Sequence, residues 1–200
     1  MKGTPWEGAI RSPAVIWSPL LNLPGRSAYD GLFHITDWLP TFYGLAGGNV
    51  TNLRNIDGFS QWDAVRKVEP PPRTEFLVNL DQIDKYEAIR RVNFKLVKGV
   101  AMEGRLDRWY PPRGNVPWNT TMPRRACESS IVTKALQMIG ERPVCGYSDS
   151  LYSVQVKCGV KSPKKACDAS KGPCLFDLSQ DPCEYVDVAD EHPEITKTLL

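Results

Sequence analysis

Hydrophobic and polar positions change in short blocks along this 200-residue chain, and the blocks predict a mixture of strands and helices. Residues 14–17 (Ala-Val-Ile-Trp), with Ser-Pro on both sides, predict a strand buried on both faces, which belongs in a larger sheet. Residues 36–46 carry apolar side chains at helical spacing and predict a helix that a glycine pair ends. Thr36 is its expected cap, Pro40 is tolerated in its first turns, and Trp38 is expected in a core or groove.

A proline-rich stretch at residues 68–73 separates these elements from a different kind of sequence. Its three consecutive prolines predict an extended segment, and we place a domain boundary there. Residues 75–80 and 88–100 are rich in β-branched and aromatic side chains, so they predict strands, the second as a hairpin arm that faces a core. Residues 106–125 show no periodicity and predict a long loop.

The last third of the chain predicts short elements and a helix at its end. Residues 191–200 predict the start of a helix whose apolar face includes Ile195, Leu199 and Leu200. Because the pattern stops partway, we expect this helix to be truncated. The other predicted elements are a short helix at 133–139, a strand at 151–156, and a strand at 175–178 followed by a turn at 179–182.

Composition argues against several classes of protein. The formal net charge is +2 and the basic residues are scattered among acids, so there is no electrostatic case for a nucleic-acid partner. No apolar run reaches the roughly 18–20 residues of a membrane span, and the N-terminus lacks the layout of a signal peptide. The two histidines, His34 and His192, lie in no nucleophile signature, so surface or packing roles are predicted for both.

Six cysteines all lie from residue 127 onward, in a segment rich in Gly, Pro and Lys, and this predicts a disulfide-stapled region. A zinc site is the alternative, but zinc ligands are usually closely paired, as in C-x-x-C, and these cysteines lie farther apart. Cys174 and Cys183 flank one predicted strand and are a candidate close pair, although the sequence does not decide the pairing. The disulfide candidates are Cys127, Cys145, Cys158, Cys167, Cys174 and Cys183.

Two N-glycosylation sequons begin at Asn49 and Asn119, in Gly- or Pro-rich stretches that are expected to be exposed loops. Together with the cysteines they indicate the secretory pathway, with a lysosomal or extracellular destination. That location requires a signal peptide, which this chain does not show. We therefore expect Met1 to be an internal residue of a longer protein.

The N-terminal block resembles the sulfatase family, in which a lysine precedes a Trp-Glu-Gly-Gly-x-Arg motif that leads into a sheet strand. Ala9 replaces the second glycine. The matching residues are Lys2, Trp6, Glu7, Gly8 and Arg11.

Three later segments also resemble the family, in the same order: residues 34–48, the Ile-Asp-Gly at 56–58, and the Leu-Phe-Asp-Leu signature of 175–190. The pattern is most similar to the arylsulfatase B group (N-acetylgalactosamine-4-sulfatases) and its arylsulfatase I and J relatives. The resemblance implies an alkaline-phosphatase-like α/β fold. Residues 1–72 are then the end of the large catalytic domain, and residues 73–200 are a small, disulfide-rich C-terminal domain with an antiparallel sheet and a terminal helix.

The resemblance also implies chemistry that this chain carries only in part. Sulfatases convert a Cys or Ser in a C/S-x-P-x-R motif to formylglycine, whose hydrate attacks the sulfate ester beside a calcium ion. That motif and the Asp-Asp and Asp-Asn calcium ligands are absent from this sequence, so none of its residues is expected to hold metal or cofactor. Lys2 matches the lysine that contacts the sulfate and its bridging oxygen, although an isolated lysine is usually a surface residue. Trp6, Glu7 and Arg11 are interpreted as holding the turn that presents Lys2.

Two functional hypotheses follow. In the first, the chain is the C-terminal part of an arylsulfatase that acts, at full length, on aryl sulfates or sulfated carbohydrates, and it is inactive alone. In the second, it is a secreted, non-catalytic glycoprotein module derived from a sulfatase C-terminal domain.

Overall fold

The structure is a computed structural model that describes residues 3–17, 28–105, 121–143, 145, 156 and 166–200. The chain divides into two compact units. The first unit comprises residues 1–25, 29–108 and 156–200, and the second comprises 26–28 and 109–155. The predicted strand at 151–156 lies, except for Val156, outside the described residues.

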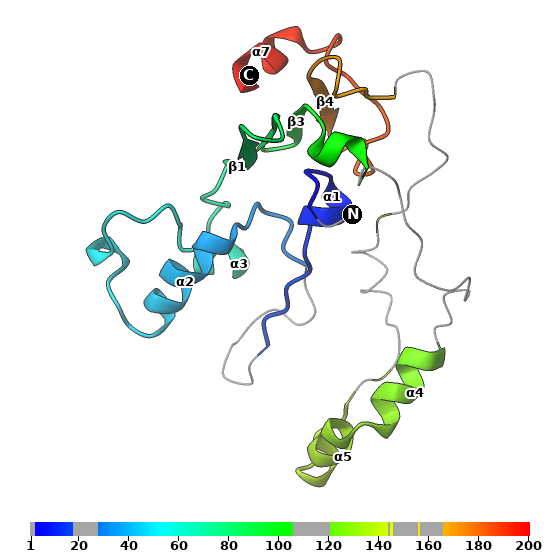
Figure 1. Cartoon of the computed structure of the whole chain (residues 1–200). Coiled ribbons are helices and arrows are strands. Elements are labelled where there is room, and N and C mark those ends of the chain that lie inside the picture. The colour runs from blue at the N-terminus through cyan, green and yellow to red at the C-terminus, as the bar shows by residue number, and fades with distance from the viewer. Residues whose placement is uncertain (1–2, 18–27, 106–120, 144, 146–155, 157–165) are drawn as a thin grey trace. The chain divides into compact units, whose positions relative to one another are not determined.

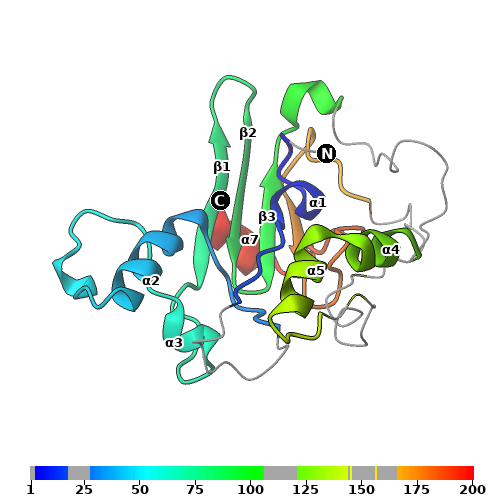
Figure 2. The same ribbon diagram turned by 90° about the horizontal axis from the view of Figure 1, so that it is seen from below.

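A four-stranded antiparallel sheet forms the centre of the first unit, in the order β1-β2-β3-β4 (Figure 2). The strands are β1 (Glu75–Asp81), β2 (Tyr86–Arg91), β3 (Phe94–Lys98) and β4 (Cys174–Asp177). The prediction of one hairpin arm over 88–100 is wrong in part, because the chain turns at Val92, which is exposed and lies in the left-handed region at φ 49°. β2 and β3, on either side of this turn, are the two arms of a hairpin. β4 comes from a distant part of the sequence and pairs with β3, with Leu96 opposite Leu175. The strands predicted at 75–80 and 175–178 are therefore confirmed.

Side chains alternate between the two faces of the sheet along each strand, and each face packs against another part of the chain. One face carries Val97 and Phe176, both fully buried, and packs against Trp6. The other carries Leu96 and Leu175 and packs against α7 (Pro193–Leu199). Figure 1 shows α1 (Glu7–Ile10) and α7 on opposite sides of the sheet. The α/β class, with a small antiparallel sheet and a terminal helix, is as the resemblance implies.

The helix predicted at 36–46 is present, but its cap and its buried side differ from the prediction. His34 caps a 3₁₀ turn, η1 (Ile35–Asp37), which continues into α2 (Trp38–Leu45). Pro40 and Thr41 are buried, whereas Leu39 and Phe42 are exposed. The reason is a polar network around Asp37, which holds the Pro40 side of the helix against residues farther along the chain. Among the described residues, the unit's remaining helices are η2 (Val50–Asn52), α3 (Trp62–Val65) and η3 (Ala101–Gly104).

The prediction of a strand at 14–17 is wrong. These residues form no regular element, and Val15 and Trp17 are 89% and 77% exposed. A strand buried on both faces needs neighbouring strands and covering layers. The sheet of the described residues contains β1 to β4 alone and provides no partner for this segment. At the other end, Leu199 is buried as predicted but Leu200 is exposed.

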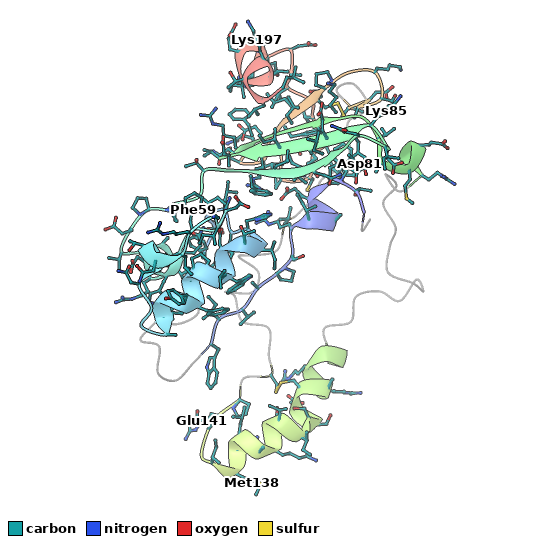
Figure 3. The ribbon with its side chains drawn as sticks, turned by 60° about the vertical axis from the view of Figure 1, so that its left-hand side comes forward. Phe59, Asp81, Lys85, Met138, Glu141 and Lys197 are labelled. Carbon is teal, nitrogen blue, oxygen red and sulfur yellow. A yellow bond between two sulfur atoms is a disulfide. The ribbon has the colours of Figure 1, made fainter. Side chains whose placement is uncertain are left out.

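The second unit is described for two helices, α4 (Thr121–Ser129) and α5 (Ile131–Met138). α5 confirms the helix predicted at 133–139, and it starts earlier because the Ser130 hydroxyl accepts a hydrogen bond from the Thr133 N–H. The loop predicted at 106–125 lies outside the described residues up to residue 120. From residue 121 the prediction is wrong, because α4 begins there and a proline in the first turn is compatible with a helix. Met138 lies exposed at the end of α5 (Figure 3).

Disulfides join Cys127 to Cys145 and Cys167 to Cys174, with Cα–Cα distances of 5.4 and 5.8 Å. Cys183 is also disulfide-bonded. The expected pairing of Cys174 with Cys183 is therefore wrong. The chain turns back over residues 168–171 and brings Cys167 beside the first residue of β4, whereas Cys183 follows the far end of that strand. Sulfur atoms held in disulfides are not available as zinc thiolates. None of the described helices is long and apolar enough to cross a membrane.

Candidate functional site

The residues that follow Lys2 are packed against the sheet of the first unit. Lys2 itself lies outside the described residues. Thr4 and Pro5 are buried, and the Trp6 ring meets the edge of the Phe176 ring, with 5.8 Å between centroids and an interplanar angle of 77°. Edge-to-face contacts of this kind stabilise aromatic pairs by about 0.5–1.5 kcal/mol beyond area burial. The N-terminal block is thus held in place from Thr4 onward.

Glu7 connects this block to the sheet through buried charges. Its Oε1 lies 3.1 Å from Lys95 Nζ, and its Oε2 lies 3.2 Å from Arg90 Nη1. The Glu7 N–H donates a 2.7 Å hydrogen bond to Glu184 Oε2, while Glu184 Oε1 lies 2.6 Å from Lys95 Nζ. We call these four residues, Glu7, Arg90, Lys95 and Glu184, the anchor cluster.

Sheet register explains how the anchor cluster forms. Arg90 of β2 is the register partner of Lys95 of β3, and Lys95 is in turn the partner of Phe176 of β4. All three side chains therefore emerge on the face that packs against Trp6. Glu184 reaches the same place from the loop after β4, with its backbone in the left-handed region at φ 57°. A non-glycine residue there costs of order 1 kcal/mol and persists only where its surroundings fix it.

The charges of the anchor cluster balance, because it contains two carboxylates and two cations. The Lys95 side chain is 0% exposed, and those of Glu7 and Glu184 are 8% and 5% exposed. Burial raises the pKa of the Glu184 carboxyl, and the charge and hydrogen bond of Lys95 oppose that rise. Removing one member of such a buried group leaves another charge without its partner, which is strongly destabilising.

A second buried network surrounds Asp37. Arg73 Nε and Nη2 bind its carboxylate at 2.8 and 2.6 Å, and the side-chain amide of Gln61 donates at 2.9 Å. Backbone N–H groups of His34 and Phe59 also donate to Asp37. Burial by itself raises the Asp37 pKa, but these hydrogen bonds, led by that of Arg73, lower it below its usual range.

The Asp37 network also includes aromatic and hydroxyl groups. The Arg73 guanidinium lies over the Phe59 ring, 5.0 Å from its centroid. The Tyr29 hydroxyl donates to Gln61 Oε1 at 2.9 Å, and burial raises its pKa. The Thr41 hydroxyl accepts from the Gln61 N–H at 3.0 Å. The network therefore joins α2 to the segment that leads into β1.

Among the described residues, no group of three or more His, Cys, Asp or Glu side chains could hold a metal ion. Both histidine rings pack against phenylalanine, as predicted: His34 lies 5.5 Å from Phe76 and His192 lies 5.3 Å from Phe94, measured between centroids. Arg11 is exposed.

One sequon is described. The Asn49 side chain is exposed, and its Oδ1 accepts hydrogen bonds from the Thr51 N–H at 3.0 Å and the Thr51 hydroxyl at 2.7 Å. The acceptor asparagine thus lies on the surface of the unit. Asn119 and Cys158 lie outside the described residues.

Sequence reasoning missed most of both charge networks. Arg90, Lys95 and Glu184 were not singled out, because a charged residue in a strand or loop usually faces water. The one local signal is that Lys95 alternates with the apolar Phe94 and Leu96, which places it on the same face as Val97. That position faces a core once β4 has paired.

Comparison with known proteins places the chain in the sulfatase class. No family model matches the chain. Arylsulfatase J of Mus musculus is 30% identical over 203 residues, covering all of this chain and 29% of its own length. The chain is a C-terminal portion of a sulfatase-family protein.

A solved sulfatase structure, described in connection with the metabolism of multiple glycosaminoglycans by Bacteroides thetaiotaomicron, matches 82% of this chain and 22% of the solved chain. It shares 16% sequence identity with this chain, and the TM-score is 0.37. Our chain spans 29% of the length of its curated relative, arylsulfatase J.

Proposed function

We propose that this chain is the C-terminal part of an arylsulfatase and that the full-length protein hydrolyses sulfate esters of aryl or carbohydrate substrates. The chain alone lacks the catalytic nucleophile and is inactive. The observation that supports this proposal most directly is the anchoring of the Lys2 block, through Glu7, to the buried Lys95 and the half-buried Arg90 of the sheet. A lysine at the end of a block held in this way suits a role that depends on a defined position.

Lys2 acts on the leaving group in this proposal. When a sulfate ester breaks, negative charge grows on the bridging oxygen, and a fixed ammonium group near that oxygen stabilises it. The formylglycine hydrate and calcium of the family would supply the nucleophile and further charge stabilisation. The described residues contain no group of His, Cys, Asp or Glu side chains that could hold the calcium, and the sequence has no C/S-x-P-x-R motif for the formylglycine. Those groups belong to other parts of the full-length protein.

The proposal extends to domain organisation and location. Residues 1–72 complete the large domain in the full-length fold and residues 73–200 form the small domain. The protein enters the secretory pathway, is glycosylated at Asn49 and Asn119, and reaches a lysosomal or extracellular destination. The exposed Asn49 side chain and the disulfides support this location.

The test compares this 200-residue chain with the upstream-extended protein, each co-expressed with the formylglycine-generating enzyme and assayed on a chromogenic aryl sulfate with calcium. We expect turnover only by the extended protein. In that protein, Lys2→Met should lower kcat by roughly 100-fold to 1,000-fold, the usual effect of removing one charge-stabilising group. The matched control is Lys197→Met on α7, an exposed lysine (Figure 3) that should leave kcat unchanged.

Each outcome of this assay decides between hypotheses. Activity of the short chain alone would contradict its assignment as an inactive part. An extended protein that folds and is secreted, yet hydrolyses no sulfate ester, would favour the alternative of a non-catalytic secreted module.

A further inference from the structure

The outward side of the helix formed by η1 and α2 is apolar. Its apolar side chains lie three or four residues apart, so they project from one side of the helix. Leu39 and Phe42 on this side are 57% and 54% exposed. Asp37 and Thr41, on the opposite side, are buried. This is the reverse of an ordinary surface helix, which buries its apolar side and turns its polar side to water. We define the α2 face as the exposed residues Ile35, Leu39, Phe42 and Tyr43.

The network around Asp37 holds the helix in this orientation. The Asp37 carboxylate binds Arg73 Nε and Nη2 at 2.8 and 2.6 Å, and it accepts from the Gln61 side-chain amide at 2.9 Å. The Thr41 hydroxyl accepts from the Gln61 N–H at 3.0 Å. A rotation of α2 that turned the α2 face inward would break these bonds and leave a buried carboxylate without its cation, which is strongly destabilising. The α2 face is therefore a preformed surface that points away from the network.

α2 also lacks the charged side chains of a helix whose outer side meets water. None of its residues, Trp38–Leu45, is Asp, Glu, Lys or Arg. α7 provides the contrast within the same unit, because Leu199 is buried there while Glu194 and Lys197 are exposed. A helix without a charged side is typical of a position that is covered on both sides. An exposed apolar row of this kind therefore marks an interaction surface.

We propose that the α2 face docks against an apolar sheet face in the upstream part of the full-length protein. This inference rests on the proposed function only in that the full-length protein is a folded sulfatase, and not on its activity. The chain spans 29% of the length of arylsulfatase J, so most of such a protein lies upstream of it. In α/β proteins, helices cover the faces of a sheet with their apolar sides inward. An uncharged aliphatic and aromatic helix face matches the Val-, Ile- and Leu-rich surface of such a sheet.

A second copy of this chain is the alternative occupant, and the size of the α2 face argues against it. Residues 35–46 rise about 18 Å along the helix axis, and a helix is about 10 Å wide. A stable interface between separate proteins covers about 800 Å² on each partner. Two copies that met through the α2 face alone would bury much less. Parts of one continuous chain need no such minimum, because the linkage between them already supplies most of the entropy cost of association.

The experiment is hydroxyl-radical footprinting, read residue by residue by mass spectrometry, of this 200-residue chain and of the upstream-extended protein. We expect oxidation of Leu39 and Phe42 to fall roughly fivefold in the extended protein, because half-exposed side chains would become core side chains. Ile83, 91% exposed in the turn between β1 and β2, is the internal control and should be oxidised equally in both proteins. Equal oxidation of the α2 face in both folded proteins would overturn the proposal. Protection that depends on the concentration of the short chain alone would assign the face to a second copy and overturn it as well.

A pair of matched variants tests the same surface within the extended protein, and it does not require the short chain to stay folded. Glutamine is a good helix former, so Leu39→Gln changes the α2 face without weakening α2 itself. In the docked state the new amide would be buried without a hydrogen-bond partner. Leu39→Gln should therefore lower the urea midpoint of the extended protein by at least about 0.5 M, whereas Ile83→Gln should leave it unchanged. Equal midpoints for the two variants would contradict docking through the α2 face.

Footprinting and the activity assay fail independently of each other. An extended protein that hydrolyses sulfate esters, while Leu39 and Phe42 are oxidised as readily as in the short chain, would overturn the docking and leave the proposed function standing. A folded extended protein with a protected α2 face and no sulfatase activity would overturn the proposed function and leave the docking standing.

Discussion

Replacing Arg73 with methionine should lower the free energy of unfolding of this chain by about 3 kcal/mol, roughly a hundredfold or more in the folding equilibrium. The Asp37 carboxylate is 0% exposed and would lose both of its contacts to Arg73, at 2.8 and 2.6 Å. Breaking a buried pair in this way costs about 3–5 kcal/mol. The lower end applies because two backbone N–H groups and the Gln61 amide still donate to the carboxylate.

The assay is urea denaturation of the whole chain, followed by tryptophan fluorescence and by far-ultraviolet circular dichroism. A denaturant slope of about 1–3 kcal/mol per molar converts the expected change into a midpoint lowered by about 1–3 M. Arg91→Met is the matched control. Arg91 pairs with Glu75 at 3.6 Å, with both side chains more than half exposed, and exposed pairs contribute about 0–1 kcal/mol.

The double variant Asp37→Asn with Arg73→Met separates lost packing from the uncompensated charge. It should be more stable than Arg73→Met alone, because no buried charge remains without a partner. An Arg73→Met protein within 1 kcal/mol of wild type, or no more affected than Arg91→Met, would refute the reasoning that Asp37 depends on Arg73.

Three further predictions concern pH, a disulfide and a glycan. Because the folded-state pKa of Asp37 is lowered, its ionisation stabilises the fold above its unfolded pKa of about 3.9, and this contribution is lost as pH falls through the folded pKa. The stability difference between wild type and Asp37→Asn should therefore shrink below about pH 4 in urea titrations, and a constant difference would contradict this. Replacing Cys167 and Cys174 together by serine should lower the free energy of unfolding by about 2–3 kcal/mol, measured by thermal unfolding, and no change would show that the closed loop contributes nothing. Asn49→Gln in secreted protein should remove one endoglycosidase-sensitive mobility shift on gels, whereas Thr51→Ser should retain it.

Local sequence patterns were sufficient for much of the secondary structure. The β-branched and aromatic residues of 75–80 predicted β1, and Leu-Phe-Asp-Leu predicted β4. Those of 88–100 predicted a strand but not the turn at Val92, which divides the segment between β2 and β3. These predictions succeeded because a residue's neighbours two to four positions away decide whether a strand or a helix can bury one side. The strand prediction at 14–17 failed because a strand also needs neighbouring strands to pair with, and an apolar sequence alone does not provide them.

Only part of the candidate site could be predicted from the sequence. The motif match singled out Lys2, Trp6, Glu7 and Arg11, but it contained no information on what holds them. Glu7 binds Glu184, 177 positions away in sequence, and no local pattern relates such residues. The same limit applied to Cys174, whose disulfide partner depended on the direction of a turn.

The sequence by itself therefore determined the strands and helices with clear periodicity, the concentration of cysteines in the C-terminal part of the chain, and the family resemblance carried by short motifs. Tertiary structure alone decided which face of α2 is buried, which cysteines pair, and how the charges of Lys95 and Asp37 are neutralised. The physical reason is that burial of a charge or an apolar face is a property of two surfaces in contact. Only the fold brings the second surface into place.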